Sequence, residues 1–305
     1  MRARLNLCSF GLSVLLVSAC GAASQSSARS PGSGPTLAEL AAGAQQAELI
    51  FGTSDYAPGR IRISFLLARS DGTLVSRNRA RVWIAAERSS APLAQATAQL
   101  EVITVPGAHV SPYGTSHLFV VRTALSHAGK YWLLVRPIGG RRLAALAAFV
   151  VKTWTAALPV GANAIASQTP TLGSSHGDLR AITTHVPPDR ALLRYSVAAS
   201  LAGHHPFVLV FASPAICPNR TCGPVVDVVE AVRRRLSGNG VRFIHVELYR
   251  ASNPGLGLNQ WAKQWHLPGE PFVFLVGPDG RIKAKFEGSV SAGELRAAVR
   301  SELQA

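Results

Sequence analysis

Residues 208–225 read V-L-V-F-A-S-P-A-I-C-P-N-R-T-C-G-P-V and combine three features in one short stretch. The apolar run 208–211 has the length of a buried strand, and it leads into a loop that contains Cys217 and Cys222. A Gly-Pro pair then opens an amphipathic segment, and proline in a first helical turn costs no hydrogen bond, because that N–H has no intrahelical partner. A cysteine at a helix N-terminus is favoured as the thiolate. The stretch therefore predicts a strand, a cysteine loop and a helix suited to thiol–disulfide chemistry.

The first twenty residues have the features of an export signal. Arg2 and Arg4 precede an apolar run, residues 5–17, that is too short to span a bilayer. The run ends in V-S-A-C at Cys20, which resembles the bacterial lipobox. The resemblance implies a signal peptide over residues 1–19, cleavage before Cys20 and a lipid on its sulfur. We expect a lipid-anchored protein of the cell envelope, at the outer face of the cytoplasmic membrane. Ordinary cleavage, which would give a secreted protein, is the alternative.

The number of cysteines narrows their use. Of the four in the chain, Cys8 leaves with the signal and Cys20 carries the lipid, so Cys217 and Cys222 have only each other. Disulfides persist in an export compartment. A ring of six residues stabilises a fold by only about 2 kcal/mol in the loop-closure model. This favours a redox pair over a passive staple, with metal ligation as a third possibility.

The formal net charge of +15 comes from 31 Lys and Arg against 16 Asp and Glu. No run of basic residues interleaved with aromatics is present, so we predict no nucleic-acid partner. The first interpretation is a solvated arginine-rich surface. Attraction of the anchored protein to an anionic membrane surface is the second.

Residues 46–153 predict an all-β domain, because short strand-like segments alternate with turn signals. The expected strands are residues 47–51, 60–67, 81–87, 99–105, 117–125, 130–136 and 143–151. The motif A-G-K-Y-W at residues 128–132 resembles the late hairpin of bacterial immunoglobulin-like domains. The resemblance implies an immunoglobulin-like sandwich and says nothing of activity. Residues 20–45 are read as a flexible tether, and residues 154–189 as a connector.

Residues 190–305 alternate helix and strand, which predicts an α/β domain. The expected strands are residues 208–211, 242–247, 272–276 and 282–286, and the expected helices are residues 190–201, 225–236, 259–265 and 291–303. Parallel strands joined by crossover helices, followed by an antiparallel hairpin, fit this order.

This region resembles the thioredoxin superfamily, particularly its exported thioredoxin-like and peroxiredoxin-like members. The matching motifs are F-A-S-P-A-I-C after the first core strand, C-G-P at the next helix, and G-E-P-F-V-F-L-V-G-P-D-G-R at residues 269–281. The resemblance implies a thioredoxin-like fold with Pro271 as the family's cis-proline, and a substrate groove at Pro271, Glu270 and Trp261. It implies no cofactor and no metal. The expected partners are protein thiols or disulfides and an electron donor or acceptor.

The sequence departs from the family at the cysteines. Val225 stands where C-x-x-C would have its second cysteine, so Cys217 and Cys222 form a C-x4-C pair instead. Six residues can bring two Cα atoms within the roughly 4.4–6.8 Å that a disulfide requires. We expect Cys222 to attack and Cys217 to resolve, because Cys222 has the helix N-terminus. The reverse order stays open, because Cys217 lies in the more exposed loop with Arg220 nearby. The first core strand also lacks the buried acid that relays protons in many thioredoxins. Glu247 of the neighbouring strand could take that role, but we interpret it as an exposed acid at a strand end.

These features predict a membrane-anchored thiol–disulfide oxidoreductase that acts on protein disulfides. Three alternatives remain open. In the first, the thioredoxin-like region is a non-catalytic binding module with a structural disulfide. In the second, it is a copper-handling chaperone, although residues 267–271 hold no histidine for copper. A peroxidase is the third, but its P-x3-T-x2-C pattern does not fit Thr221 and Cys222.

Overall fold

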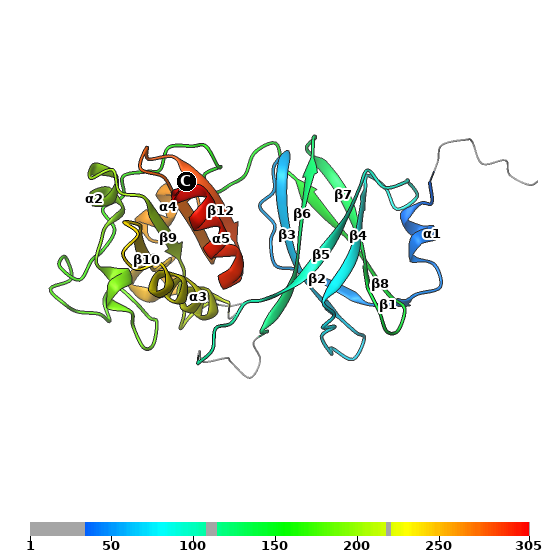
Figure 1. Ribbon diagram of the computed structural model, residues 1–305, viewed down its shortest axis with the longest axis horizontal. Helices are drawn as coiled ribbons and strands as arrows, with labels where there is room; N and C mark the ends of the chain where they lie inside the picture. The colour runs from blue at the N-terminus through cyan, green and yellow to red at the C-terminus, as the bar shows by residue number, and fades with distance from the viewer. Residues whose placement is uncertain (1–33, 108–114, 218–220, 305) are drawn as a thin grey trace, which may run out of the picture. The chain divides into compact units, whose positions relative to one another are not determined.

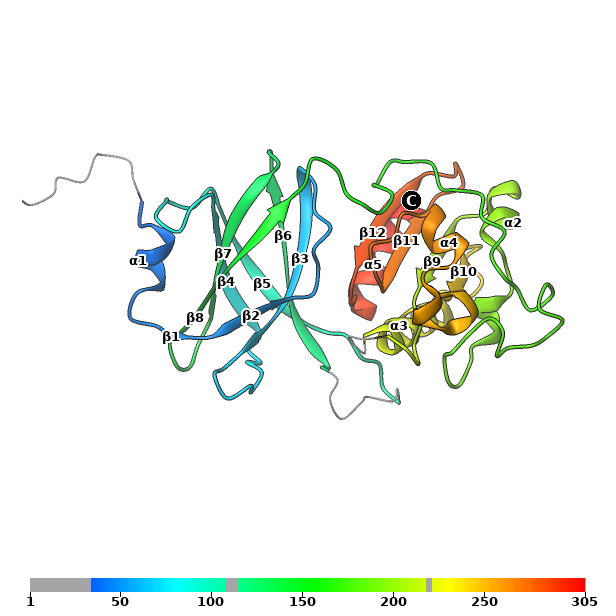
Figure 2. The ribbon, with the colours of Figure 1, turned by 180° about the vertical axis from the view of Figure 1, so that it is seen from behind.

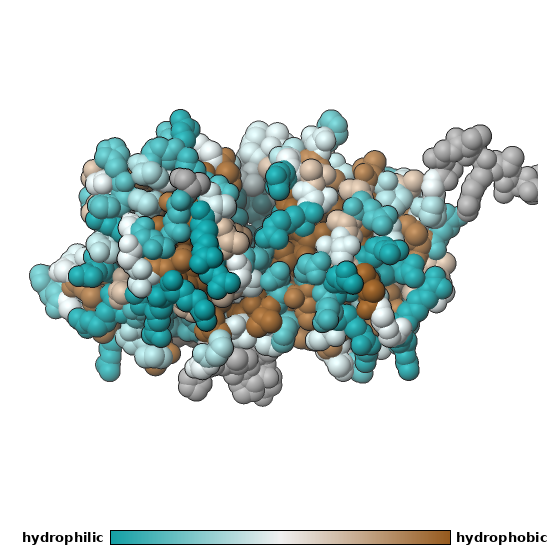
Figure 3. Space-filling model, in the orientation of Figure 1, coloured by the Kyte–Doolittle hydropathy of each residue, from teal (hydrophilic) through white to brown (hydrophobic). Residues whose placement is uncertain are grey.

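The computed structural model describes residues 34–107, 115–217 and 221–304. The expected signal peptide and Cys20 lie outside these residues. Gly34–Ala305 cluster as one compact unit, and the described strands fall into two sheets (Figure 1). No helix among the described residues has both the length and the apolar character needed to cross a membrane. The face in Figure 3 carries hydrophilic side chains throughout, with apolar patches between them.

The first sheet has eight strands in the order β1-β8-β7-β4-β5-β6-β3-β2. They are β1 (Gln45–Gln46), β2 (Glu48–Phe51), β3 (Gly59–Ala68), β4 (Arg79–Ala85), β5 (Ala94–Val102), β6 (His117–Leu125), β7 (Gly129–Pro137) and β8 (Leu143–Val151). The first part of β5 pairs with β4 and its last part with β6. Phe65 of β3 and Leu133 of β7 belong to one buried cluster, so the sheet folds over onto itself. The predicted all-β architecture is therefore present.

A short helix, α1 (Leu37–Ala41), precedes this sheet where a flexible tether was expected. Thr36 caps the helix in a reciprocal pair with Glu39. Leu37 is fully buried in a cluster with Trp83 and Leu134. The expectation of a tether as far as residue 45 is therefore wrong for this segment, since the apolar side chain of Leu37 fixes it to the sheet.

The second sheet has the order β10-β9-β11-β12, with β9 and β10 parallel and the other pairs antiparallel. Its strands are β9 (Phe207–Phe211), β10 (Arg242–Val246), β11 (Phe272–Val276) and β12 (Ile282–Glu287), and its helices are η1 (Arg190–Leu193), α2 (Val197–Ala202), α3 (Cys222–Arg235), η2 (Arg250–Ser252), η3 (Pro254–Leu256), α4 (Gln260–Gln264) and α5 (Ala292–Leu303). The predicted helix over residues 190–201 is two elements, because Ser196 caps α2 and starts a new helix there.

Both faces of this sheet are covered. Val208 and Val210 of β9 pack in a cluster with side chains of α3 and α5. Phe211 of the same strand packs in a second cluster with Trp265 and with Ala262 of α4, which is seen nearer the viewer in Figure 2. A strand buried on both faces explains why residues 208–211 are an uninterrupted apolar run.

The segment 154–189 is not a free connector. Its backbone bonds to β12 and the turn before it: Gly161 donates to the Ile282 carbonyl at 2.8 Å, and Ile282 donates to Ala162 at 2.9 Å. Trp265 donates its indole hydrogen to Ser167 at 3.1 Å. The segment therefore belongs structurally to the second sheet.

Asp55, which follows β2, is a second point of attachment for this segment. Its carboxylate accepts hydrogen bonds from the Ala156 and Ala157 N–H groups at 2.6 and 3.1 Å, and from Lys285 Nζ at 3.3 Å. Asp55 is only 7% exposed. Burial lowers the pKa of Lys285, and the charge of Asp55 opposes this effect. One buried carboxylate therefore holds residues from both sheet regions and from the segment between them.

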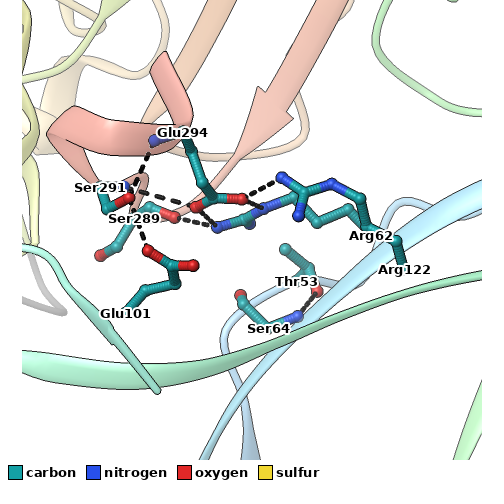
Figure 4. A network of polar contacts seen from close by, with 8 residues as sticks. All are labelled: Thr53, Arg62, Ser64, Glu101, Arg122, Ser289, Ser291 and Glu294. Carbon is teal, nitrogen blue, oxygen red and sulfur yellow. Dashed lines mark hydrogen bonds and ion pairs between the residues drawn. The ribbon is translucent and has the colours of Figure 1, made fainter. Parts of the chain in front are cut away.

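A polar network joins β3 and β6 to the start of α5 (Figure 4). Arg62 of β3 donates from Nε and Nη2 to the two oxygens of Glu294, at 3.0 and 2.9 Å, and Arg122 of β6 also pairs with Glu294. Burial raises the pKa of the Glu294 carboxyl, but the bonds and charges of Arg62 and Arg122 outweigh it and leave the pKa below its usual value. Ser291, which caps α5, donates to Glu101 at 2.8 Å.

We expect Glu294→Gln to lower the free energy of unfolding by about 2 kcal/mol, because it leaves the half-buried Arg62 without its counter-charge. Urea denaturation at pH 7 measures the change. Glu302→Gln, at an exposed position of the same helix, is the matched control and should have no measurable effect. Equal stability of the two variants would contradict a stabilising role for the network.

Candidate functional site

Cys217 and Cys222 form a disulfide with their Cα atoms 6.0 Å apart. This separation lies inside the roughly 4.4–6.8 Å range of protein disulfides. Cys217 lies in the loop after β9, and Cys222 is the first residue of α3. The apolar strand, the loop and the helix of the sequence pattern therefore bring the two sulfurs together.

Exposure distinguishes the two cysteines and opposes the expected order of attack. Cys222 is fully buried, whereas Cys217 is 8% exposed. An attacking thiolate must be reached by the sulfur of a substrate, so access favours Cys217. The helix N-terminus favours the thiolate of Cys222, but the same packing that starts α3 covers it. The preference for Cys222 rested on its helix N-terminus, and the more exposed loop position of Cys217 was the argument against it.

Glu270 lies beside the cysteine pair, and the Glu270–Pro271 peptide bond is cis. A carboxylate oxygen of Glu270 and the Sγ atoms of Cys217 and Cys222 all lie within 4.8 Å of one another. Burial raises the pKa of Glu270 to about 7, and hydrogen bonds from Ser213 and Tyr249 oppose the increase. An acid of this pKa beside two sulfurs can give or take a proton near neutral pH.

Glu247 is buried, contrary to its interpretation as an exposed acid at a strand end. It is 7% exposed, and its Oε1 accepts hydrogen bonds from Thr184 N and Oγ1 at 2.6 and 3.0 Å. Burial raises the pKa of Glu247, with these bonds and Ser213 acting against it. Ser213 is a hydrogen-bond partner of both Glu247 and Glu270, so the two carboxyls belong to one polar cluster. The residue that covers Glu247 lies 63 positions earlier in the chain, so the local sequence could not indicate it.

Two buried histidines near this cluster were not predicted. His245 is 3% exposed, and its Nε2 donates to the Ala212 carbonyl at 2.9 Å. Burial lowers its pKa to about 4. His185 is bonded through Nε2 to Asp227 of α3 at 2.9 Å. A period of two along residues 242–246 puts His245 on the same face as the buried Phe243, which is the signal that could have found it.

Trp261 lines a different cavity from Glu270. A cavity of about 300 Å³ has Trp261, His245, Glu247 and Tyr249 in its wall. Glu270 lies in the wall of a larger one, of about 840 Å³. Of the three residues expected in the substrate groove, the structure places Glu270 beside the cysteines, with Pro271 next to it in the chain, whereas Trp261 lines the cavity that also contains Glu247.

Two groups of described side chains have ligand atoms close enough to share a cation. One is Cys217, Cys222 and Glu270, and the other is His185, Asp227 and Glu230. The sulfurs of the first are joined in a disulfide, and in the second His185 is bonded to Asp227 while Arg234 pairs with Glu230. We assign neither as a metal site.

No family model matches the chain, and no curated protein matches it in sequence. Among solved structures, it is similar to a thiol:disulfide interchange protein of the thioredoxin family from Chlorobium tepidum, with 14% identity over 48% of this chain and 97% of that one, at a TM-score of 0.30. A superoxide reductase (neelaredoxin) from Ignicoccus hospitalis is 9% identical over 34% of this chain and 78% of its own, at a TM-score of 0.20. A conjugative transposon lipoprotein from Bacteroides eggerthii is 8% identical over 34% and 94%, at a TM-score of 0.18.

Proposed function

We propose that the chain is a thiol–disulfide oxidoreductase that acts on protein disulfides through Cys217 and Cys222. The observation that carries the proposal is the disulfide itself, with a Cα separation of 6.0 Å and with the Glu270 carboxylate beside both sulfurs. The strand order β10-β9-β11-β12 supports a thioredoxin-like fold for this region. The order β2-β3-β6-β5-β4-β7-β8 supports an immunoglobulin-like sandwich before it.

The location is part of the same proposal. A signal peptide over residues 1–19 and a lipid on Cys20 would hold the protein at the outer face of the cytoplasmic membrane. Disulfide exchange suits that side of the membrane, where thiols are oxidised. The proposed domains are the sandwich at residues 46–153 and the redox domain at residues 190–305, with the segment between them packed on the latter.

The chemistry needs no cofactor. In the reducing direction the Cys217 thiolate attacks one sulfur of a client disulfide, the client S–S bond breaks, and the other client sulfur leaves as a thiolate that takes a proton. The Cys222 thiolate then attacks Cys217 in the mixed disulfide, releases the second client thiolate and closes the Cys217–Cys222 bond. Two electrons pass to the client, and a dithiol donor must return them.

Glu270 is placed to handle the protons of these steps. Its carboxyl is about half protonated near neutral pH, because burial raises its pKa to about 7. The protonated form can donate to a leaving thiolate, and the ionised form can accept the proton of the next attacking thiol.

We expect Glu270→Gln to slow exchange with a peptide disulfide about tenfold at pH 7, since an amide cannot transfer the proton. The pH profile of kcat/KM should also lose an inflection near pH 7. Glu48→Gln, at an exposed position of β2, should keep both the rate and the inflection. A variant at Glu270 with the full rate and an unchanged profile would show that this carboxyl moves no proton in the reaction.

Redox titration of the full chain tests the function. The protein is equilibrated in buffers of reduced and oxidised dithiothreitol, and the thiols of the Cys217–Cys222 pair are counted after alkylation. We expect reversible reduction of the pair and turnover of a peptide disulfide. A pair that stays oxidised in excess dithiol, without turnover, would contradict the proposal and leave a binding module with a fixed disulfide.

A further inference from the structure

A large cavity lined by described residues runs from the cysteine site to the eight-stranded sheet. Its volume is about 840 Å³, within the roughly 300–1,000 Å³ of ligand pockets in proteins. One wall contains Thr221, the residue before Cys222, and the segment 268–270 that leads into Pro271. The cavity therefore reaches Glu270, whose carboxylate lies within 4.8 Å of both cysteine sulfurs.

The opposite wall is apolar and comes from β2, β3 and β6. Ile50 of β2 is the Cα partner of Leu66 of β3, and Leu118 of β6 and Leu74 of the loop after β3 lie in the same wall. Ile50 is 43% exposed and Leu74 is 41% exposed, and the two lie together in one wall of the cavity rather than singly on the surface. We call these four side chains the leucine wall.

The leucine wall continues the face of the sheet that holds α5. Arg62, Ser64 and Leu66 occupy alternate positions of β3, so their side chains lie on the same face of the sheet. Arg62 binds Glu294 of α5 through two hydrogen bonds, at 3.0 and 2.9 Å. Leu66, two positions after Ser64, lies on this face and lines the cavity. Arg62 therefore attaches this face of β3 to α5, and Leu66 of the same face lines the cavity together with residues 268–270.

We propose that the leucine wall is the second half of the client groove, and that it takes an extended apolar segment of a client protein beside its reacting cysteine. This rests on the proposed function and gives the β-sandwich a role in it. A strand-like client segment that passes the cis-Pro271 corner has side chains on two sides. One side meets the segment 268–270, and apolar side chains on the other bury Ile50 and Leu74. The exposed aliphatic surface, which costs free energy in water, is then covered only in the complex.

The test compares two synthetic peptide disulfides of equal length and charge. One has leucine and valine around its cysteine, and the other has serine and glycine. With the reduced wild-type protein we expect kcat/KM to be about tenfold higher for the apolar peptide, the gain from partial burial of one aliphatic contact. Ile50→Asp and Leu74→Asp should each bring this ratio close to one.

Ile138→Asp is the matched control, because Ile138 has the same exposure as Ile50, 43%, and is not among the residues of this cavity. It should keep the tenfold preference. Exchange with glutathione disulfide, which is too small to reach the leucine wall, should be equal in all four proteins and shows that the variants are folded.

Two results would overturn the inference: equal rates for the two peptides with the wild type, or a preference that survives Ile50→Asp and Leu74→Asp. Either result, with normal glutathione exchange, leaves the oxidoreductase proposal intact. Absence of exchange with every disulfide, in the wild type as well, is the failure of the oxidoreductase proposal itself.

Discussion

Replacing Cys222 with serine is expected to stop turnover and to trap clients as mixed disulfides on Cys217. Cys217 is the less buried of the two cysteines, 8% exposed against 0% for Cys222, so we expect a client sulfur to reach Cys217 first. Without the second thiol, the mixed disulfide has no internal group to resolve it. Turnover should therefore stop once the first mixed disulfide has formed, because only an external thiol can release the client.

The measurement is thiol trapping followed by non-reducing electrophoresis of each single variant with a peptide or protein disulfide. Cys217→Ser is the paired variant and should be equally inactive but form no adducts, because the remaining thiol is enclosed. Adducts in Cys217→Ser and none in Cys222→Ser would reverse the assignment. Adducts in neither variant would argue against exchange chemistry at this site.

Acidification from pH 7 to pH 4 is expected to remove about 3 kcal/mol of the free energy of unfolding through His245 alone. Burial lowers the pKa of His245 to about 4, from 6.5 in an unfolded chain. As the pH falls through 6.5, the unfolded state takes up this proton first, so stability declines until the folded state is also protonated near pH 4. His185 opposes the charged form of His245, while the carboxylate of Glu247 lies 4.0 Å from its Nε2.

The contribution of His245 is measured as a difference. Urea denaturation is followed at several pH values between 4 and 7 for the wild type and for His245→Gln, which can still donate to the Ala212 carbonyl. Between pH 7 and pH 4, the free energy of unfolding of the variant should fall by about 3 kcal/mol less than that of the wild type. His127→Gln, at an exposed position, should follow the wild type. Parallel curves for the wild type and His245→Gln would mean that this ring is charged in the folded protein or titrates at its usual pKa.

The strands could be predicted largely from the sequence, because buried strands leave a strong pattern of apolar residues. The expected strand over residues 143–151 has the bounds of β8, and β9 begins one residue before its expected start. The weakest prediction was β5, expected at residues 99–105 and found at Ala94–Val102. Its first half is A-Q-A-T-A, and alanine is small enough to pack inside while giving little hydrophobic signal. Helix α1 is five residues long, and its T-x-x-E capping pattern was the only sign of it.

The candidate site was predicted in part, and the errors have one cause. The cysteine pair, Glu270 and Pro271 lie in local motifs that can be read directly. The burial of Glu247 depends on Thr184, and the burial of His185 on α3, and both contacts join positions far apart in the chain. The exposure of Cys217 and Cys222 likewise depends on packing that no local pattern records. The reactive groups of a site can be found from the sequence, but whether each group is buried or exposed depends on the tertiary fold.

Asp55 has a practical consequence for protein engineering. A truncated protein that starts after β8 would retain both cysteines and the whole second sheet, yet it would lack the carboxylate that pairs with Lys285 and holds the Ala156 and Ala157 amides. The Lys285 ammonium group would then lose its counter-charge, and the Ala156 and Ala157 amides would lose their acceptor. The part of the chain that holds the disulfide is for this reason a poor candidate for expression alone, and biochemical work is best done on a polypeptide that keeps the eight-stranded sheet.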